Sequence, residues 1–133
     1  MTKEAPAPVR IEVSPGELVD KITILEIKSG RIDDPAKLKN VTHELAALTR
    51  VAAVLPESDD LGRLRGALKK VNEALWEIED EIRLCERNRD FGPRFVELAR
   101  SVYRSNDQRA QLKRRINELL GSAIVEEKSY QDY

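Results

Sequence analysis

The sequence predicts an all-α protein, an antiparallel four-helix bundle in which the last two helices form a long hairpin. Charged residues make up 35% of the 133 residues and aromatic residues only 5%, which is typical of solvated helices rather than of a β-sandwich. Apolar side chains recur at steps of three and four along four segments, and capping residues or helix breakers separate these segments. The chain length suits one domain with a single modest core.

The two ends of the chain carry weaker signals. Residues 1–8 contain two prolines and are expected to form a disordered tail, which leaves one helical domain over residues 9–133. Apolar and charged residues alternate over residues 9–13, the pattern of a short N-terminal β-strand. Ile124 and Val125, an apolar pair in the C-terminal tail, offer a second strand for a small β-ribbon with this segment.

The first helix is predicted over residues 15–32. The preceding SPGE supplies a serine N-cap, a proline at the first helical position and a glutamate at the third, which is the arrangement of a capping box. A helix that is apolar on several sides is either central in a bundle or buried by a second chain. Three apolar residues lie off its main seam and form a candidate interface with a second copy or a partner protein: Val19, Ile24 and Ile27.

Three further helices are predicted over residues 35–55, 59–89 and 93–120. The second begins after an aspartate N-cap and ends at a proline, and serine and aspartate residues cap the third. The third carries an apolar seam of about four heptads without a miss, which favours an extended helix with coiled-coil-like packing. The triplet DFG followed by proline breaks it, and Gly121 ends the fourth helix as a natural C-cap glycine.

The helix over residues 93–120 raises the main functional question. Its apolar seam passes through Ser105 and Arg109, with Asn106 beside them. In a hairpin that turns near Phe91, Glu73 faces Arg109 and Glu77 faces Ser105. We therefore expect Arg109 to pair with one of these two glutamates, because an unpaired charge inside a helical seam would cost several kcal/mol.

Two interpretations of this polar layer remain open. In the first, a buried polar layer fixes the register of the helices, as a single polar residue does in coiled coils. In the second, the layer is a pocket whose basic side chains hold an anion. The candidate residues are the same in both cases: Glu73, Glu77, Tyr103, Arg104, Asn106 and Arg109.

No catalytic residue, cofactor or metal ligand is assigned from the sequence. The motifs of phosphate-binding loops, dinucleotide-binding folds, zinc proteases and nucleophile elbows are all absent. Glu73, Glu77 and Glu81 share one helix face, but the paired glutamates of helical Mg²⁺ enzymes are missing. The basic residues from Arg94 to Arg115 face the acidic segment in the expected hairpin, and the net charge is −1, so nucleic-acid binding is not expected.

The chain has no apolar run long enough to span a membrane and no secretory signal at its start. Its single cysteine, Cys85, cannot form an internal disulfide. These features predict a reduced protein of the cytoplasm.

Several segments resemble a small bacterial protein family of unknown function. They are SPGELVDKITILEIK, LWEIEDEIR, RSVYRSNDQRAQLKRRINELLGS and the ending VEEKSYQDY, and the resemblance covers about residues 13–133. It implies a compact helical bacterial protein of the cytoplasm and brings no activity, substrate or cofactor. Because SYQDY belongs to the matched region, the tail is expected to have a role of its own.

The sequence thus favours a non-enzymatic interaction or assembly module that forms a homo-oligomer or binds a partner protein. The alternative is a protein that binds, or an enzyme that acts on, an anionic or phosphorylated small molecule at the polar layer between the last two helices.

Overall fold

The computed structural model describes residues 6–133 and confirms the all-α prediction. Residues 1–5, which belong to the expected disordered tail, lie outside the described residues. No predicted helix end differs from the observed one by more than three residues. The four helices are α1 (Pro15–Arg31), α2 (Pro35–Ala52), α3 (Asp59–Arg87) and α4 (Pro93–Leu119).

The helix ends follow the predicted capping chemistry. The Ser14 hydroxyl accepts a hydrogen bond from the backbone N–H of Glu17 at 3.2 Å, and Asp34 and Ser58 cap α2 and α3 in the same way. Gly121 follows α4 with a φ of 65°, the left-handed conformation that glycine adopts without strain. The carboxylate of Glu17 reaches another helix, since it lies 2.6 Å from the ammonium group of Lys113 on α4.

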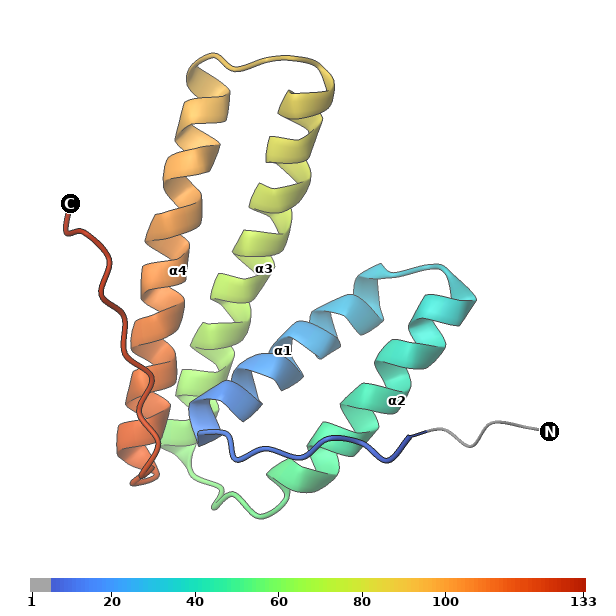
Figure 1. Cartoon of the computed structure of the whole chain (residues 1–133), viewed down its shortest axis with the longest axis vertical. Helices are drawn as coiled ribbons and strands as arrows, with labels where there is room; N and C mark the ends of the chain where they lie inside the picture. Colours follow the sequence, from blue (N-terminus) through green and yellow to red (C-terminus); the bar gives the residue numbers. More distant parts are fainter. Residues whose placement is uncertain (1–5) are drawn as a thin grey trace.

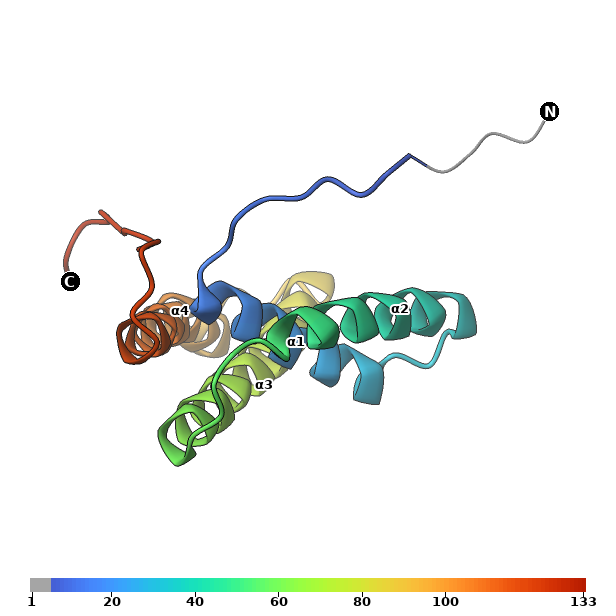
Figure 2. The same cartoon turned by 90° about the horizontal axis from the view of Figure 1, so that it is seen from below.

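The molecule consists of two helical hairpins of unequal length (Figure 1). The long α3/α4 hairpin, the most extensive helix pair in the structure, confirms the prediction. Helix α1 crosses the half of this hairpin that contains the start of α3 and the end of α4. Within the described residues, α1 contacts all three other helices, whereas α2 contacts only α1. The half of the hairpin near the α3–α4 turn therefore projects past the other helices, and we call residues 74–106 the distal hairpin (Figure 1). Figure 2, seen from below, shows α4 on one side and α2 on the other, with α1 between them.

The core lies where α1, α3 and α4 meet. Val19 of α1, Leu68 of α3 and Ile116 of α4 are at most 2% exposed and contact one another. Half-buried leucines surround them: Leu55, Leu61, Leu64, Leu112 and Leu120. Within residues 6–133, no helix has both the length and the apolar character that crossing a membrane requires.

A close contact fixes the start of α1 against α4. The backbone N–H of Gly16, which lacks a partner within its own first turn, donates a buried hydrogen bond of 2.7 Å to Oδ1 of Asn117. A Cβ atom at Gly16 would lie 2.9 Å from this same oxygen and closer still to the carbonyl oxygen of Lys113. Only glycine lets the two backbones approach this far.

The predicted N-terminal strand is wrong. Residues 9–13 form no β-structure, and neither do Ile124 and Val125, so no β-ribbon exists within residues 6–133. The side chains of Val9 and Ile11 are 92% and 78% exposed. The alternating pattern alone does not produce a strand, because a strand must pair with another strand, and residues 6–133 contain none.

The C-terminal tail folds back along α4, in the direction opposite to that helix (Figure 1). Glu126 lies 2.9 Å from Lys113, and further along the tail the hydroxyl of Tyr133 donates to Asp107 at 2.6 Å. Polar contacts therefore hold the tail over about the middle of α4.

We predict that Gly16→Ala destabilises the protein by about 1–3 kcal/mol, because the added methyl group overpacks the α1–α4 contact. Gly66→Ala provides the matched control, since an added Cβ atom at this exposed site in α3 meets nothing within 4 Å. The control should be stabilised by about 0.5–1 kcal/mol. Urea unfolding of the two variants measures both values, and equal effects would contradict the close approach at Gly16.

Candidate functional site

A groove of about 550 Å³ lies where α1, α3 and α4 converge. This volume falls within the range of small-molecule pockets, although the groove is open on one side along the distal hairpin. Two helices supply its apolar wall, which consists of Ile24 and Ile27 from α1 and Leu75 and Trp76 from α3. We refer to it as the α1 groove.

Polar groups form the rest of the α1 groove. Its rim carries charges of both signs on α3: Glu79, Asp80 and Arg83. Its floor contains two amides and a guanidinium group, from Asn72, Asn106 and Arg109. Of these polar groups, only the Asn72 side chain is buried.

The floor rests on a buried ion pair between α1 and α4. Nε of Arg109 lies 2.9 Å from Oδ1 of Asp20, and Nη2 lies 2.5 Å from Oδ2, so the contact is bidentate. The side chain of Asp20 is 1% exposed, whereas that of Arg109 is 30% exposed and faces the groove. Asp20 therefore depends on Arg109 for its charge compensation, while Arg109 keeps contact with solvent.

Helix α3 completes this network through Asn72. The Asn72 amide donates to Oδ1 of Asp20 and to the hydroxyl of Thr23, both at 2.9 Å. The Thr23 hydroxyl in turn donates to the backbone carbonyl of Asp20 at 2.8 Å. Among the described residues, no buried side-chain nitrogen or oxygen atom lacks a hydrogen-bond partner. Three helices thus share one saturated polar network, which is the condition for burying a charged group at an acceptable cost.

This network sets the ionisation of Asp20. Burial alone would raise the pKa of its carboxyl, but the hydrogen bonds from Arg109 and Asn72 and the nearby charges of Arg109 and Lys113 outweigh burial. The net effect lowers the pKa of Asp20 below its ordinary value of 3.8. The hydrogen bond to Asp20 also raises the pKa of Arg109. Both groups are therefore charged at neutral pH.

The expected partner of Arg109 was wrong. Arg109 pairs with Asp20 of α1 rather than with Glu73 or Glu77 of α3. Glu77 instead pairs with Arg31 at the end of α1. The prediction considered only the antiparallel pairing of α3 and α4. It left out α1, which crosses the hairpin and places the Asp20 carboxylate between the two helices. Asp20 did carry a signal, since it is a charged residue between the apolar side chains of a helix that is buried on several sides.

The structure does not gather the six candidate residues of the polar layer into one site. Arg109 and Asn106 line the α1 groove, but Arg104 lies 3.6 Å from Glu97 on its own helix. Tyr103 packs against Tyr133 of the C-terminal tail. Glu73 is half-buried on α3 and does not line the groove. Only two of the six therefore share the groove.

The three candidate interface residues also separate. Val19 and Ile27 are 2% and 6% exposed within the single chain, so most of both side chains is buried by the chain's own fold. Their burial explains the broad apolar character of α1, which is the central helix. Ile24 is half-buried and lines the α1 groove together with Ile27, whereas Val19 belongs to the core.

Among residues 6–133, no group of three or more histidine, cysteine or acidic side chains is arranged to hold a metal ion. The glutamates along α3 are divided between different contacts, with Glu77 on Arg31 and Glu81 on Arg94.

The fold and the groove define a small all-α protein built on a long helical hairpin with a third helix across it. The chain belongs to a family of unknown function (DUF6165), whose profile matches residues 9–133. This match confirms the family resemblance predicted for about residues 13–133. Comparisons with curated proteins and with solved structures give no match.

The buried network predicts a defined pH dependence. Because folding lowers the pKa of Asp20, its charge contributes stability above the unfolded value near 3.8, and this contribution is lost as the pH falls through the lower folded value. At neutral pH, Asp20→Asn should lower the unfolding free energy by about 1.5–3 kcal/mol. This difference from the parent should shrink as the pH falls below about 4.

Urea unfolding of the parent and of Asp20→Asn between about pH 7 and about pH 3 tests this dependence. Asp33→Asn controls for the loss of a carboxylate at an exposed position. A stability difference for Asp20→Asn that stays constant over the whole range would contradict the charged pair.

Proposed function

We propose that the protein is a non-enzymatic assembly module that self-associates through its α1 groove and distal hairpin. One observation carries the proposal, namely that the α3/α4 hairpin extends past the helix that covers its other half. A pair of helices alone cannot bury its apolar residues, so this part of the molecule presents a surface that suits another helix.

The burial of the distal hairpin supports this proposal. In the helical parts of the distal hairpin, residues 74–87 and 93–106, Leu98 is the only buried side chain. Large apolar residues are half-buried there: Leu75, Trp76, Ile78, Ile82, Phe95 and Val102. Others are about half exposed, at 50% for Leu84, 53% for Phe91 and 52% for Val96. Apolar side chains that stay exposed in this number on a charged protein are characteristic of an interaction site.

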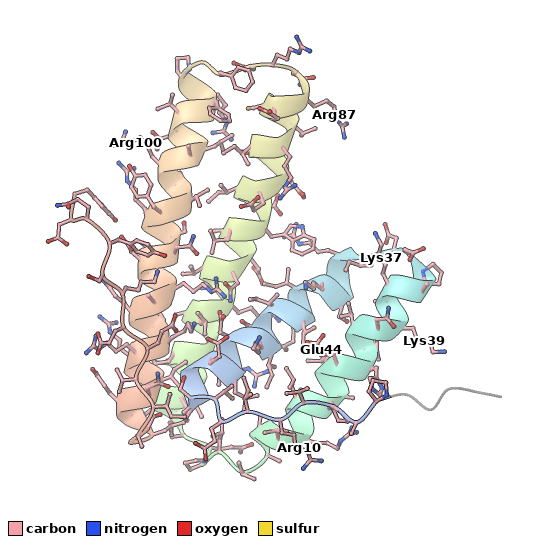
Figure 3. The ribbon with its side chains drawn as sticks, viewed as in Figure 1. Arg10, Lys37, Lys39, Glu44, Arg87 and Arg100 are labelled. Atoms are coloured by element: carbon pink, nitrogen blue, oxygen red, sulfur yellow. The ribbon has the colours of Figure 1, made fainter. Side chains whose placement is uncertain are left out.

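The charges of the distal hairpin favour a second copy of this chain as the partner. Residues 73–81 of α3 contain five acidic residues and no basic one. The facing half of α4 carries arginines, among them Arg100, which lies on its outer side (Figure 3). Two hairpins related by a twofold axis would place the acidic helix of each copy against the basic helix of the other. Complementary charges of this type select the partner and its orientation.

The alternative, an anion site at the polar layer, has weaker support. Arg109 faces the groove, but its Nε and Nη2 atoms already bind both oxygens of Asp20. The rim adds Glu79 and Asp80, which would repel a phosphate or a carboxylate. The free side of the Arg109 guanidinium and the Asn106 amide suit a polar contact of an incoming helix.

The proposed setting is the cytoplasm of a bacterium. A lone thiol, Cys85, on the half-buried seam of α3 is compatible with a reducing compartment.

The proposal predicts a concentration-dependent dimer whose formation buries Trp76. Sedimentation velocity between about 1 and about 300 µM should show a shift from monomer to dimer, a range that covers weak and moderate interfaces. Because Trp76 is the only tryptophan, its fluorescence should shift to shorter wavelength over the same range. Trp76→Ala should weaken the dimer at least tenfold, since buried tryptophans dominate interfaces.

Val54→Ala is the matched control, because Val54 is 80% exposed just after α2 and does not line the groove. It should leave the dissociation constant unchanged, and circular dichroism checks that both variants keep their helices. A parent that stays monomeric at the highest concentration, or a Trp76→Ala variant that dimerises like the parent, would overturn the proposal.

A further inference from the structure

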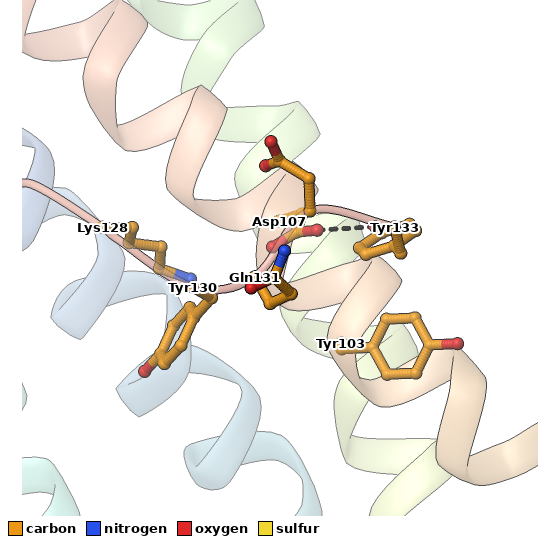
Figure 4. Close-up of a pocket in the computed structure, with 7 residues that line it drawn as sticks. Tyr103, Asp107, Lys128, Tyr130, Gln131 and Tyr133 are labelled. Carbon is orange, nitrogen blue, oxygen red and sulfur yellow. Dashed lines mark hydrogen bonds between the residues drawn. The ribbon is translucent and has the colours of Figure 1, made fainter.

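A second cleft, of about 740 Å³, lies between the C-terminal tail and α4 (Figure 4). Helix α4 contributes Tyr103 and Asp107, and the tail contributes Lys128 and residues 130–133. We call it the tail cleft. It shares no lining residue with the α1 groove, although Tyr103 belongs to the distal hairpin.

All three tyrosines of the chain line the tail cleft: Tyr103, Tyr130 and Tyr133. The rings of Tyr103 and Tyr133 lie 5.1 Å apart at an angle of 63°, so they form a corner with an exposed ring face. The faces of aromatic rings carry partial negative charge and attract cations. Three such rings in a chain with only 5% aromatic residues are a strong local concentration.

Two carboxylates, those of Asp107 and Asp132, stand beside these rings, against the single positive charge of Lys128. Oδ2 of Asp107 accepts the hydrogen bond of Tyr133, which anchors the tail and leaves Oδ1 for a second donor. The lining of the cleft therefore has a net negative charge, and it combines carboxylate acceptors with ring faces.

The tail already places a cation of its own on one ring. Nζ of Lys128 lies 5.6 Å from the centroid of the Tyr130 ring, within the range of a cation–π contact. This contact uses one tyrosine and leaves the corner of Tyr103 and Tyr133 for another cation. Lys128 also acts as an internal competitor of any bound cation, because it occupies the Tyr130 ring and its positive charge repels a further cation in the cleft.

We propose that the tail cleft binds an organic cation, an alkylammonium or a guanidinium group, between its tyrosine rings and its two carboxylates. The cation is either a free small molecule or a lysine or arginine side chain of a peptide. The rings provide the surface that suits a large, weakly hydrated cation, and the carboxylates provide the opposite charge.

Tyrosine resonances give a direct readout, because every tyrosine of the chain lies in this cleft and the single tryptophan lies in the other groove. Protein labelled on both aromatic residue types is titrated with tetramethylammonium chloride and with arginine amide, each up to about 100 mM, well above the millimolar constants that a few exposed contacts give. Sodium chloride at equal ionic strength is the reference. Saturable shifts of the tyrosine signals, with Trp76 unchanged, are expected.

Three variants test the assigned roles. Tyr103→Ala and Asp107→Asn should each weaken binding by roughly two- to fivefold, the share of one cation–π or exposed charge contact. Lys128→Ala should strengthen binding, because it removes the internal competitor. Lys37→Ala, on α2 far from the cleft (Figure 3), should leave binding unchanged and controls for the loss of a positive charge.

The outcomes separate clearly. No saturable tyrosine shift with either cation would overturn the proposal, and so would equal shifts in sodium chloride. Weaker binding by Lys128→Ala would also contradict it, since the lysine would then be part of the binding surface. An arginine-containing peptide that binds more tightly than arginine amide would identify a protein ligand, whereas equal constants would identify a small organic cation.

Discussion

The ion pair between Asp20 and Arg109 is the interaction on which the arrangement of the helices depends. Asp20 is inaccessible to solvent, so any shift of α1 that separated it from Arg109 would leave a buried carboxylate without its counter-ion. Replacing such a pair with apolar residues often costs little, whereas breaking it costs several kcal/mol. The pair therefore contributes mainly to the specificity of helix packing. Together with Asn72, it permits only one position of α1 on the hairpin.

This position of α1 has two consequences for the surface. The helix covers the half of the hairpin that contains Leu68 and Ile116 and ends at Arg31, which meets Glu77 on α3. Beyond that point the distal hairpin has no third helix, and its apolar residues stay half-buried. The α1 groove lies at this boundary, where a buried polar floor meets an apolar wall that contains Trp76. A helix from a second copy would continue the packing that α1 begins.

The sequence predicted local structure well because local signals are strong here. Caps such as Ser14 and Ser58 and breakers between the segments located the helix ends, and the long seam of α3 located its partner, α4. The sequence also showed that Arg109 needs a carboxylate. It did not identify Asp20, because that choice depends on how α1 crosses the hairpin, and the crossing is set by contacts between residues about a hundred positions apart, such as Gly16 and Asn117. The tail cleft was missed for a similar reason, since no periodicity predicts that a polar tail returns to Tyr103.

The most direct test of this account is a pair of double-mutant cycles on unfolding free energy. One cycle combines Asp20→Asn with Arg109→Met, and the other combines Glu73→Gln with Arg109→Met. The account predicts a coupling energy of about 2 kcal/mol or more between Asp20 and Arg109, and one within about 0.5 kcal/mol of zero between Glu73 and Arg109. A negligible coupling in the first cycle, or a larger one in the second, would mean that α1 is not held on the hairpin by this pair.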